Sequence, residues 1–184
     1  MGKVTVITGG TSGIGRGIAE KILAESAAED RVFVTYGHNE DKAQAFLENL
    51  PLEKRSQVIL MKADMSSYED MMDFVAELKD QADHIDWLVS NAGVSTYAKY
   101  EDYTFEEWTR IVNTNLSVPV FMVKELRPMM SEGGSILFTG SYAGQQAYSS
   151  SLVYGVTKAA IHFLAKSLVK EFEPKGITVN AIAP

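Results

Sequence analysis

Tyr154 and Lys158 are four positions apart in the stretch SSSLVYGVTKAA, near the end of the 184-residue chain. Side chains at this spacing lie on one face of an α-helix. A phenol that exchanges a proton near neutral pH needs its phenolate stabilised by roughly 4 kcal/mol. An ammonium group about 4 Å away supplies about that much at an effective dielectric constant of about 20. The pair is therefore a candidate acid and base, although the same spacing also arises by chance.

Two further polar residues, Ser141 and Asn115, lie in the elements predicted before this helix. Ser141 follows the apolar run SILFTG, at the end of a predicted strand. Asn115 lies in the helical pattern IVNTNLSVPVF, where an asparagine that has no part in a site would bond to nearby backbone. The positions of the surrounding elements must decide between these interpretations.

A glycine-rich turn follows the first apolar run, in TGGTSGIGRGIAE at residues 8–20. Its glycines do not fit the G-x-G-x-x-G pattern of dinucleotide-binding proteins. Glycines nevertheless permit a tight turn and a close approach of a pyrophosphate, and the N-terminus of the helix expected at Ile14 to Ala24 offers amide donors. We expect phosphate binding here, the alternative being an ordinary turn between a strand and a helix.

Short β-branched runs alternate with amphipathic helical patterns along the whole chain. The runs are expected to be strands at residues 3–8, 31–36, 57–62, 87–91, 135–140 and 177–182. Strands that are apolar on both faces and joined by helices predict an α/β fold with a Rossmann-type, doubly wound parallel sheet in a single domain, 1–184. Such sheets bind ligands at the carboxyl ends of their strands, so each functional motif should lie at that edge of the sheet.

The ordered set of motifs resembles the short-chain dehydrogenase/reductase family over essentially the whole chain. It consists of TGGTSGIG, NAG at residues 91–93, Asn115, Ser141 and YGVTK. The resemblance implies a nicotinamide cofactor whose pyrophosphate binds Gly9, Ser12, Gly13, Ile14 and Gly15. Further cofactor contacts implied are Tyr36, His38, Asp64, Met65, Asn91, Ala92, Gly93, Tyr154, Lys158 and Pro184.

The family resemblance gives individual roles to several of these residues. Asp64 would accept a hydrogen bond from the adenine amino group, although a carboxylate ahead of MSSYEDMMDF could also cap the following helix. Tyr36 stands where an aspartate that favours NAD would be expected, in VTYGHNEDK, and no arginine follows at once. We therefore expect NADP(H) to be favoured over NAD(H), with His38, Asn39 and Arg16 as possible partners of the 2′-phosphate.

The activity implied is hydride transfer between nicotinamide and a ketone or secondary alcohol. Tyr154 would exchange a proton with the substrate oxygen, and Ser141 would hydrogen-bond the same atom. Lys158 would stabilise the phenolate and bind the nicotinamide ribose, and Asn115 would hold a water of a proton relay. The chain is similar to 3-oxoacyl-(acyl-carrier-protein) reductases of fatty acid biosynthesis. Alternatives are a sugar, polyol or other secondary alcohol dehydrogenase, and an NADP(H)-sensing regulatory protein without catalysis.

Composition disfavours several other kinds of function. A net charge of -7 disfavours nucleic acid and anionic membranes as partners, and the absence of cysteine excludes thiolate sites. His38, His84 and His162 are scattered, so no metal site is expected. The first strand begins at once and leaves no room for a signal peptide. A cytoplasmic protein is therefore expected, and the family resemblance implies a small-molecule carbonyl or acyl thioester as its substrate.

Two expectations concern the molecule as a whole. The helices near residues 105–127 and 153–172 carry more apolar surface than one face of a sheet needs, so we expect a homodimer or homotetramer. The chain ends at VNAIAP, where the resemblance would continue with a last strand and a segment that covers the substrate. We therefore expect the domain to be incomplete at its C-terminus.

Overall fold

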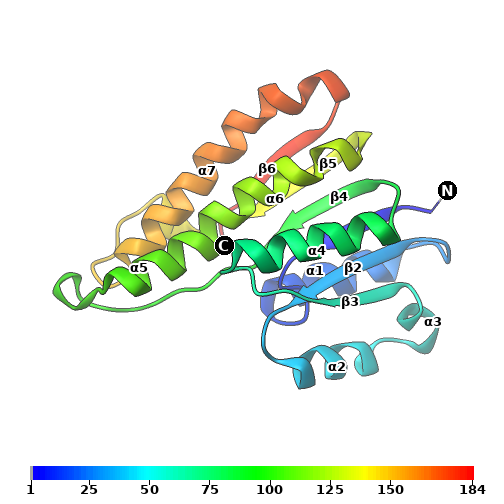
Figure 1. The fold of residues 1–184 in the computed structure, drawn as a ribbon, viewed down its shortest axis with the longest axis horizontal. Helices are drawn as coiled ribbons and strands as arrows, with labels where there is room; N and C mark the ends of the chain where they lie inside the picture. The colour runs from blue at the N-terminus through cyan, green and yellow to red at the C-terminus, as the bar shows by residue number, and fades with distance from the viewer. Residues whose placement is uncertain (1) are drawn as a thin grey trace.

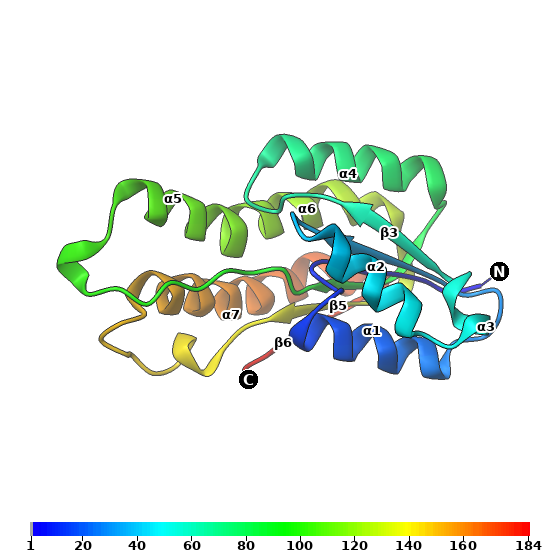
Figure 2. The same ribbon diagram turned by 90° about the horizontal axis from the view of Figure 1, so that it is seen from below.

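A computed structural model describes residues 2–184, which form a parallel sheet of six strands covered by helices on both faces (Figures 1 and 2). The strand order is β3-β2-β1-β4-β5-β6. The strands are β1 (Val4–Ile7), β2 (Arg31–Tyr36), β3 (Val58–Lys62), β4 (Ile85–Ser90), β5 (Met130–Thr139) and β6 (Thr178–Ile182). The predicted Rossmann-type α/β fold is confirmed. The chain winds in opposite directions from β1, so the switch point lies between β1 and β4.

Seven α-helices connect the strands within the described residues. They are α1 (Gly13–Glu25), α2 (Glu40–Asn49), α3 (Leu52–Arg55), α4 (Tyr68–Gln81), α5 (Phe105–Val112), α6 (Val118–Leu126) and α7 (Leu152–Phe172). A π-helical turn, η2 (Asn113–Ser117), joins α5 to α6 without a break. The short 3-10 helices are η1 (Tyr100–Asp102), η3 (Arg127–Met129), η4 (Tyr142–Gly144) and η5 (Glu173–Lys175).

Two hydrophobic cores lie on opposite faces of the sheet (Figure 2). On one face, Leu23 of α1 and Phe46 of α2 pack with Ile7 and Val34 of the central strands. On the other face, α4, α6 and α7 cover the sheet, with buried residues that include Phe74, Met122, Ile161, Phe33 and Phe138. Burial on both faces explains why the strands read as continuous apolar runs rather than alternating ones.

The fifth strand begins five positions earlier than the sequence suggests, at Met130 rather than residue 135. Its pairing with β4 shifts between Ile85, which faces Met130, and Trp87, which faces Ser135. The intervening segment SEGG therefore forms an irregularity of the kind seen at β-bulges, with Gly133 at a φ of 73°. Polar residues and glycines hide this part of the strand from an analysis of apolar runs.

The helices α5 and α7 extend past the carboxyl ends of the strands, where long loops connect them to β4 and β5 (Figure 1). A backbone hydrogen bond from Ala98 to Ser150, 3.1 Å long, joins these two loops. Among the described residues, the segment Leu152–Lys175 is long and apolar enough to cross a membrane. This is weak evidence, because core helices pass the same test and α7 buries Ile161 and Phe172 against the sheet.

Candidate active site

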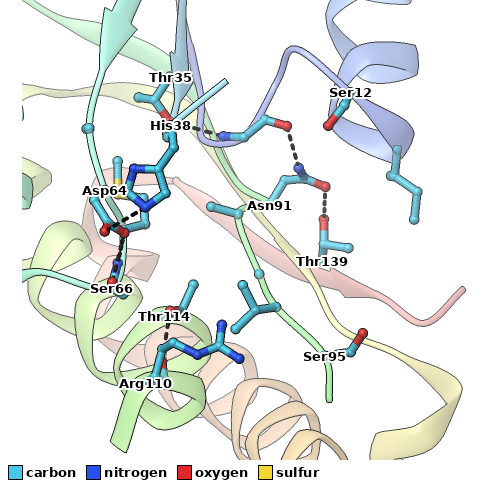
Figure 3. Close-up of a pocket in the computed structure, with 18 of the residues that line it drawn as sticks. Ser12, Thr35, His38, Asp64, Ser66, Asn91, Ser95, Arg110, Thr114 and Thr139 are labelled. Atoms are coloured by element: carbon cyan, nitrogen blue, oxygen red, sulfur yellow. Dashed lines mark hydrogen bonds and ion pairs between the residues drawn. The ribbon is translucent and has the colours of Figure 1, made fainter. Parts of the chain in front are cut away.

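A cleft of about 500 Å³ opens at the carboxyl ends of the strands, beside the switch point (Figure 3). It is bounded by the glycine-rich turn, the ends of β2, β3, β4 and β5, and the helices α5 and α7. The predicted site residues that line it are Gly9, Ser12, Ile14, His38, Asp64, Met65, Asn91, Ala92, Gly93, Tyr154 and Lys158. The sequence motifs thus converge on one cavity.

The glycine-rich turn is shaped by residues that cannot carry a side chain. Gly9 has a φ of 61°, in the left-handed region that favours glycine. A Cβ at Gly15 would overlap the carbonyl oxygen of Gly9 and the side chain of Asn91. Gly13 and Gly15 do not line the cleft; they allow the turn to fold behind it. The result is an open backbone surface in front of the N-terminus of α1, which suits a phosphate group.

Asn91 holds the ends of three strands together (Figure 3). Its side-chain nitrogen donates to the carbonyl oxygens of Thr8 (3.0 Å) and Gly9 (3.2 Å), and its side-chain oxygen accepts from the hydroxyl of Thr139 (3.1 Å). The hydroxyl of Thr8 in turn accepts from the backbone N–H groups of Asn91 and Ala92. This network fixes the glycine-rich turn relative to β4 and β5.

Asp64 faces the cleft from the end of β3. One oxygen accepts hydrogen bonds from the backbone N–H (2.9 Å) and hydroxyl (2.8 Å) of Ser66, and the other lies 3.4 Å from Nε2 of His38. Burial raises the pKa of Asp64, but the Ser66 bonds and the charges of His38 and Arg110 outweigh it and hold that pKa below its ordinary value. Ser67, not Asp64, caps α4 by accepting from the N–H of Asp70. The carboxylate therefore stays ionised and available to a ligand.

The residues expected to bind a 2′-phosphate lie in different surroundings. His38 lines the cleft. Asn39 caps α2 by accepting from the N–H of Lys42, and Arg16 forms an ion pair with Glu20 at 2.7 Å. Tyr36 does not line the cleft, and its carbonyl oxygen accepts from the N–H of Ala63. His38 is thus the one of these residues in the cleft.

Tyr154 and Lys158 lie in the first two turns of α7, and both line the cleft. Lys158 is 4 % exposed, and its Nζ donates to the carbonyl oxygen of Thr139 at 2.6 Å. The same Nζ is 5.5 Å from the centroid of the Tyr154 ring. Burial lowers the pKa of Lys158 to about 8. The ammonium is therefore held beside the tyrosine, and the loss of hydration on burial makes its charged form less favourable than in water.

Ser141 does not line the cleft itself but adjoins α7 at the end of β5. Its hydroxyl oxygen accepts from the N–H of Ala143 at 3.2 Å, which leaves the hydroxyl hydrogen free to donate elsewhere. Glycines bring this segment close to α7, because a Cβ at Gly144 would overlap the backbone of Lys158 and one at Gly155 would lie 2.9 Å from the carbonyl oxygen of Ala143. The segment after β5 is thus packed against the helix of Tyr154.

Asn115 is buried in the π-helical turn, behind the cleft. Its side chain accepts from the N–H of Val94 (2.8 Å) and donates to the carbonyl of Val94 (2.9 Å) and to the hydroxyl of Thr157 (3.1 Å). A Cβ at Gly93 would lie 3.3 Å from its oxygen and 3.4 Å from Nζ of Lys158. Asn115 therefore bonds to the loop after β4 and to α7 rather than only to nearby helix backbone, and it adjoins Lys158 across Gly93.

Pro184, which was expected to contact the cofactor, is exposed and lies outside the cleft. Its carbonyl oxygen accepts a hydrogen bond from the N–H of Tyr142.

Some residues that line the cleft carry no signal in the sequence. Thr139 could have been found as the last residue of β5 and Thr35 as the residue before the last of β2, whereas Arg110 reaches the cleft from α5 with no motif to mark it (Figure 3). The lining residues that sequence reasoning missed are Thr35, Gly37, Ala63, Ser66, Val94, Ser95, Arg110, Thr114 and Thr139.

Comparison with known proteins places the chain among oxidoreductases. A family model described as short chain dehydrogenase matches residues 3–184. The chain is 34 % identical over 186 residues to the acetoacetyl-CoA reductase of Rhizobium meliloti, covering 100 % of the chain and 73 % of the relative. It is 30 % identical over 186 residues to the 3-oxoacyl-(acyl-carrier-protein) reductase of Staphylococcus epidermidis, covering 100 % and 75 %.

A solved structure agrees with this assignment. The short chain dehydrogenase from Burkholderia cenocepacia J2315, crystallised in complex with NADP, superposes with a TM-score of 0.90 at 27 % identity. The match covers 100 % of this chain and 74 % of that one.

Proposed function

The chain belongs to the short chain dehydrogenase family, and from this premise we propose that it is an NADP(H)-dependent reductase of 3-oxoacyl thioesters. An oxidoreductase of this family binds a nicotinamide cofactor and acts on a small molecule. The observation that carries the proposal is the convergence of Tyr154, Lys158 and the glycine-rich turn on one cleft. The domain proposed for this activity is residues 1–184.

The cleft fits a dinucleotide. The turn between β1 and α1 leaves an open backbone surface, and the carboxylate of Asp64 can accept from an exocyclic amine. We propose that Gly9, Ser12 and Ile14 contact the pyrophosphate, and that Gly13 and Gly15 maintain the turn. When bound, the cofactor supplies the hydride. The remaining contacts proposed are His38, Met65, Asn91, Ala92, Gly93, Tyr154 and Lys158, with Tyr36 and Pro184 nearby.

The residues of this chain manage the proton. Tyr154 donates its hydroxyl proton to the carbonyl oxygen as negative charge develops there. The hydroxyl hydrogen of Ser141 donates a second hydrogen bond to that oxygen. It is free to do so because the hydroxyl oxygen acts as an acceptor for the N–H of Ala143. The Lys158 ammonium stabilises the phenolate that remains. Asn115 keeps the loop at Val94 and the helix of Lys158 in register, beside the route by which the proton is replaced.

The proposed preference for NADP(H) is supported by the charges near the end of β2. No carboxylate stands at position 36 to repel a 2′-phosphate. His38 lines the cleft beyond the end of β2, where its imidazole could donate a hydrogen bond to a 2′-phosphate. KM values for NADPH and NADH measure the preference, and a KM for NADH about tenfold lower than that for NADPH would overturn this part of the proposal.

The substrate class follows from the relatives named as acetoacetyl-CoA and 3-oxoacyl reductases, since a 3-oxo thioester presents the ketone that Tyr154 and Ser141 would polarise. An acidic carrier protein would dock on basic side chains, and two such side chains on this chain, Lys124 and Arg127, are partly neutralised. Lys124 pairs with Glu125 at 3.2 Å, and Arg127 pairs with Glu171 at 3.6 Å. The proposal therefore rests on the thioester and not on its carrier.

A substrate panel tests the proposal with the full-length protein. NADPH oxidation is followed with acetoacetyl-CoA, the same acyl group on a carrier protein, and simple ketones, and NADP reduction with sugars and polyols. Turnover of the 3-oxoacyl thioesters is expected. Turnover of sugars or polyols alone would overturn the substrate class. Tight NADPH binding without turnover of any of these compounds would favour a cofactor-sensing role.

We also propose that two copies of the chain associate through α5 and α7. Large apolar side chains are exposed there, including Phe105, Trp108, Val156 and Phe163. Exposed apolar surface of this kind is typical of a protein interface, and a two-fold axis lets the same helices pair with themselves. A homodimer or homotetramer is expected in light scattering, and a monomer would contradict the proposal.

A further inference from the structure

We infer that His162 is a positioning residue for Ser141, which it holds in place by accepting a hydrogen bond from the Ser141 backbone N–H. Nε2 of His162 lies 3.3 Å from that nitrogen. The inference rests on the proposed function, because it concerns the serine that would donate to the substrate oxygen. His162 lies one helical turn beyond Lys158, on the same side of α7.

Three successive backbone amides after β5 show why this contact is needed. The N–H of Gly140 donates to the carbonyl of Ile182 (2.8 Å), and that of Tyr142 donates to the carbonyl of Pro184 (3.0 Å). The N–H of Ser141, between them, does not donate to a carbonyl of the neighbouring chain segment; it donates to Nε2 of His162. A buried N–H without an acceptor is costly, so the imidazole takes the place of a backbone carbonyl at this point.

The position of Ser141 is thereby defined at both its amide and its hydroxyl. The amide is held by His162, and the hydroxyl oxygen accepts from the N–H of Ala143. Close packing supports the geometry, because a Cβ added at Gly140 would overlap the His162 ring. A shift of the imidazole would therefore move the backbone of Ser141 and, with it, the hydroxyl.

His162 can accept this bond only while Nε2 carries no proton. Burial, together with the charges of Lys158 and Lys166, lowers the pKa of His162 and favours the neutral ring. Both lysines are on α7 itself. The backbone of Gly140 and Ser141 lies against the ring, and Gln145 and Asn180 line the same pocket as His162; none of these groups carries a charge. Protonation would direct an Nε2–H at the Ser141 N–H, replacing an attraction by a repulsion.

Two substitutions separate the hydrogen bond from the bulk of the side chain. His162→Leu fills similar space without an acceptor, and we expect kcat to fall about tenfold with KM for NADPH unchanged, since one neutral hydrogen bond is lost. His162→Gln keeps an acceptor that does not titrate, and we expect kcat at pH 7 within about twofold of the wild type. A kcat for His162→Leu equal to that of the wild type would overturn the inference.

The pH profile adds a readout that a merely structural role would not move. In the wild type, kcat is expected to decline at pH values below about 6.5, the ordinary pKa of histidine, because the pKa of His162 lies lower still. In His162→Gln, the part of this decline that comes from protonation of His162 should be absent. His84→Gln is the matched control, because His84 lies away from the cleft beside Asp86. A low-pH decline that is the same in the wild type and His162→Gln would contradict the inference.

Nuclear magnetic resonance of the full-length protein tests the contact independently of turnover. The amide resonance of Ser141 is expected to shift with the titration of His162 in the wild type and to stay constant in His162→Gln. An unchanging Ser141 amide in the wild type would overturn the inference. If that resonance titrates but no carbonyl is reduced, the proposed function fails while the hydrogen bond stands, so the two failures are distinguishable.

Discussion

Tyr154 is the residue on which the proposed chemistry depends most directly, because its hydroxyl is the proposed proton donor and the residue lines the cleft. Replacement by phenylalanine removes one oxygen and keeps the ring that lies beside Lys158. General acid catalysis is worth about two to four orders of magnitude. Tyr154→Phe should therefore lower kcat by at least about two orders of magnitude.

Cofactor binding provides the control for this substitution. The glycine-rich turn and Asp64 are untouched, so the dissociation constant for NADPH, measured by fluorescence titration, should stay within about threefold of the wild type. Retained turnover in Tyr154→Phe would contradict the assignment of Tyr154 as the acid. Loss of NADPH binding would instead point to a structural defect.

Lys158 combines a functional requirement with a cost in stability. Its ammonium is 4 % exposed, and its pKa is lowered by burial to about 8, against 10.5 for the ordinary group. Between these values the unfolded chain binds more protons than the folded one, so the free energy of unfolding rises with pH. The penalty is fully present below pH 8 and amounts to roughly 3 kcal/mol.

Lys158→Met removes the titrating group and should abolish turnover. Its free energy of unfolding relative to the wild type is expected to decrease from pH 7 to pH 9.5, because only the wild type gains stability in that range. Loss of the donor to the Thr139 carbonyl gives a constant offset of about 1 kcal/mol. Urea unfolding of both proteins at the two pH values measures the difference in their free energies of unfolding. A difference that is the same at both pH values would contradict the prediction.

Residue types and order predicted the candidates that converge on the cleft, because Gly9 follows β1 and Tyr154 and Lys158 lie in the first two turns of α7, at the same edge of the sheet. Sequence reasoning did not find Thr8, Arg110 or the contact of His162. These residues act through hydrogen bonds or reach between elements far apart in the chain, as when Thr8 binds Ala92. Such pairings depend on strand order and register, which periodicity does not specify.

At the scale of elements, the turn between β1 and α1 offers a matched pair of substitutions. Gly15→Ala would place a methyl group against the carbonyl of Gly9 and the side chain of Asn91, whereas a Cβ at Gly17 meets nothing within 4 Å. Gly15→Ala should therefore distort the turn and raise the dissociation constant for NADPH at least about tenfold. Fluorescence titration of both variants measures this.

Gly17→Ala serves as the control on the same helix. It should leave the dissociation constant for NADPH unchanged. It should raise the free energy of unfolding by about 0.5–1 kcal/mol, because alanine is more favourable than glycine in the interior of a helix. Unfolding by urea checks this second value. Equal effects of the two substitutions on NADPH binding would contradict the role given to the turn.

The elements themselves could largely be predicted, since buried parallel strands and amphipathic helices have distinct patterns. The six strands were expected at nearly their observed positions, with the early start of β5 as the main departure. The π-helical turn around Asn115 was not foreseen. The π-helical turn lies inside a continuous apolar helical pattern. One extra residue in a turn changes the spacing of apolar residues too little to be detected in the sequence.

At the scale of the whole molecule, α5 and α7 extend beyond the sheet and leave apolar side chains without partners (Figure 1). Both helices also position the cleft, since Arg110 and Tyr154 lie on them. Covering this surface with a second copy would restrain the two helices as well as bury their apolar faces. Self-association and the geometry of the cleft are therefore expected to be linked.

Phe163, which is 73 % exposed on α7, is the position at which to test self-association through this surface. Phe163→Lys would place a charge in the proposed interface, so light scattering should report a smaller particle than for the wild type at the same concentration. Leu52→Lys is the matched control, because Leu52 is 76 % exposed on α3, on a different part of the molecule. If Leu52→Lys dissociates the protein while Phe163→Lys does not, the interface lies elsewhere, and the apolar face of α7 must be explained in another way.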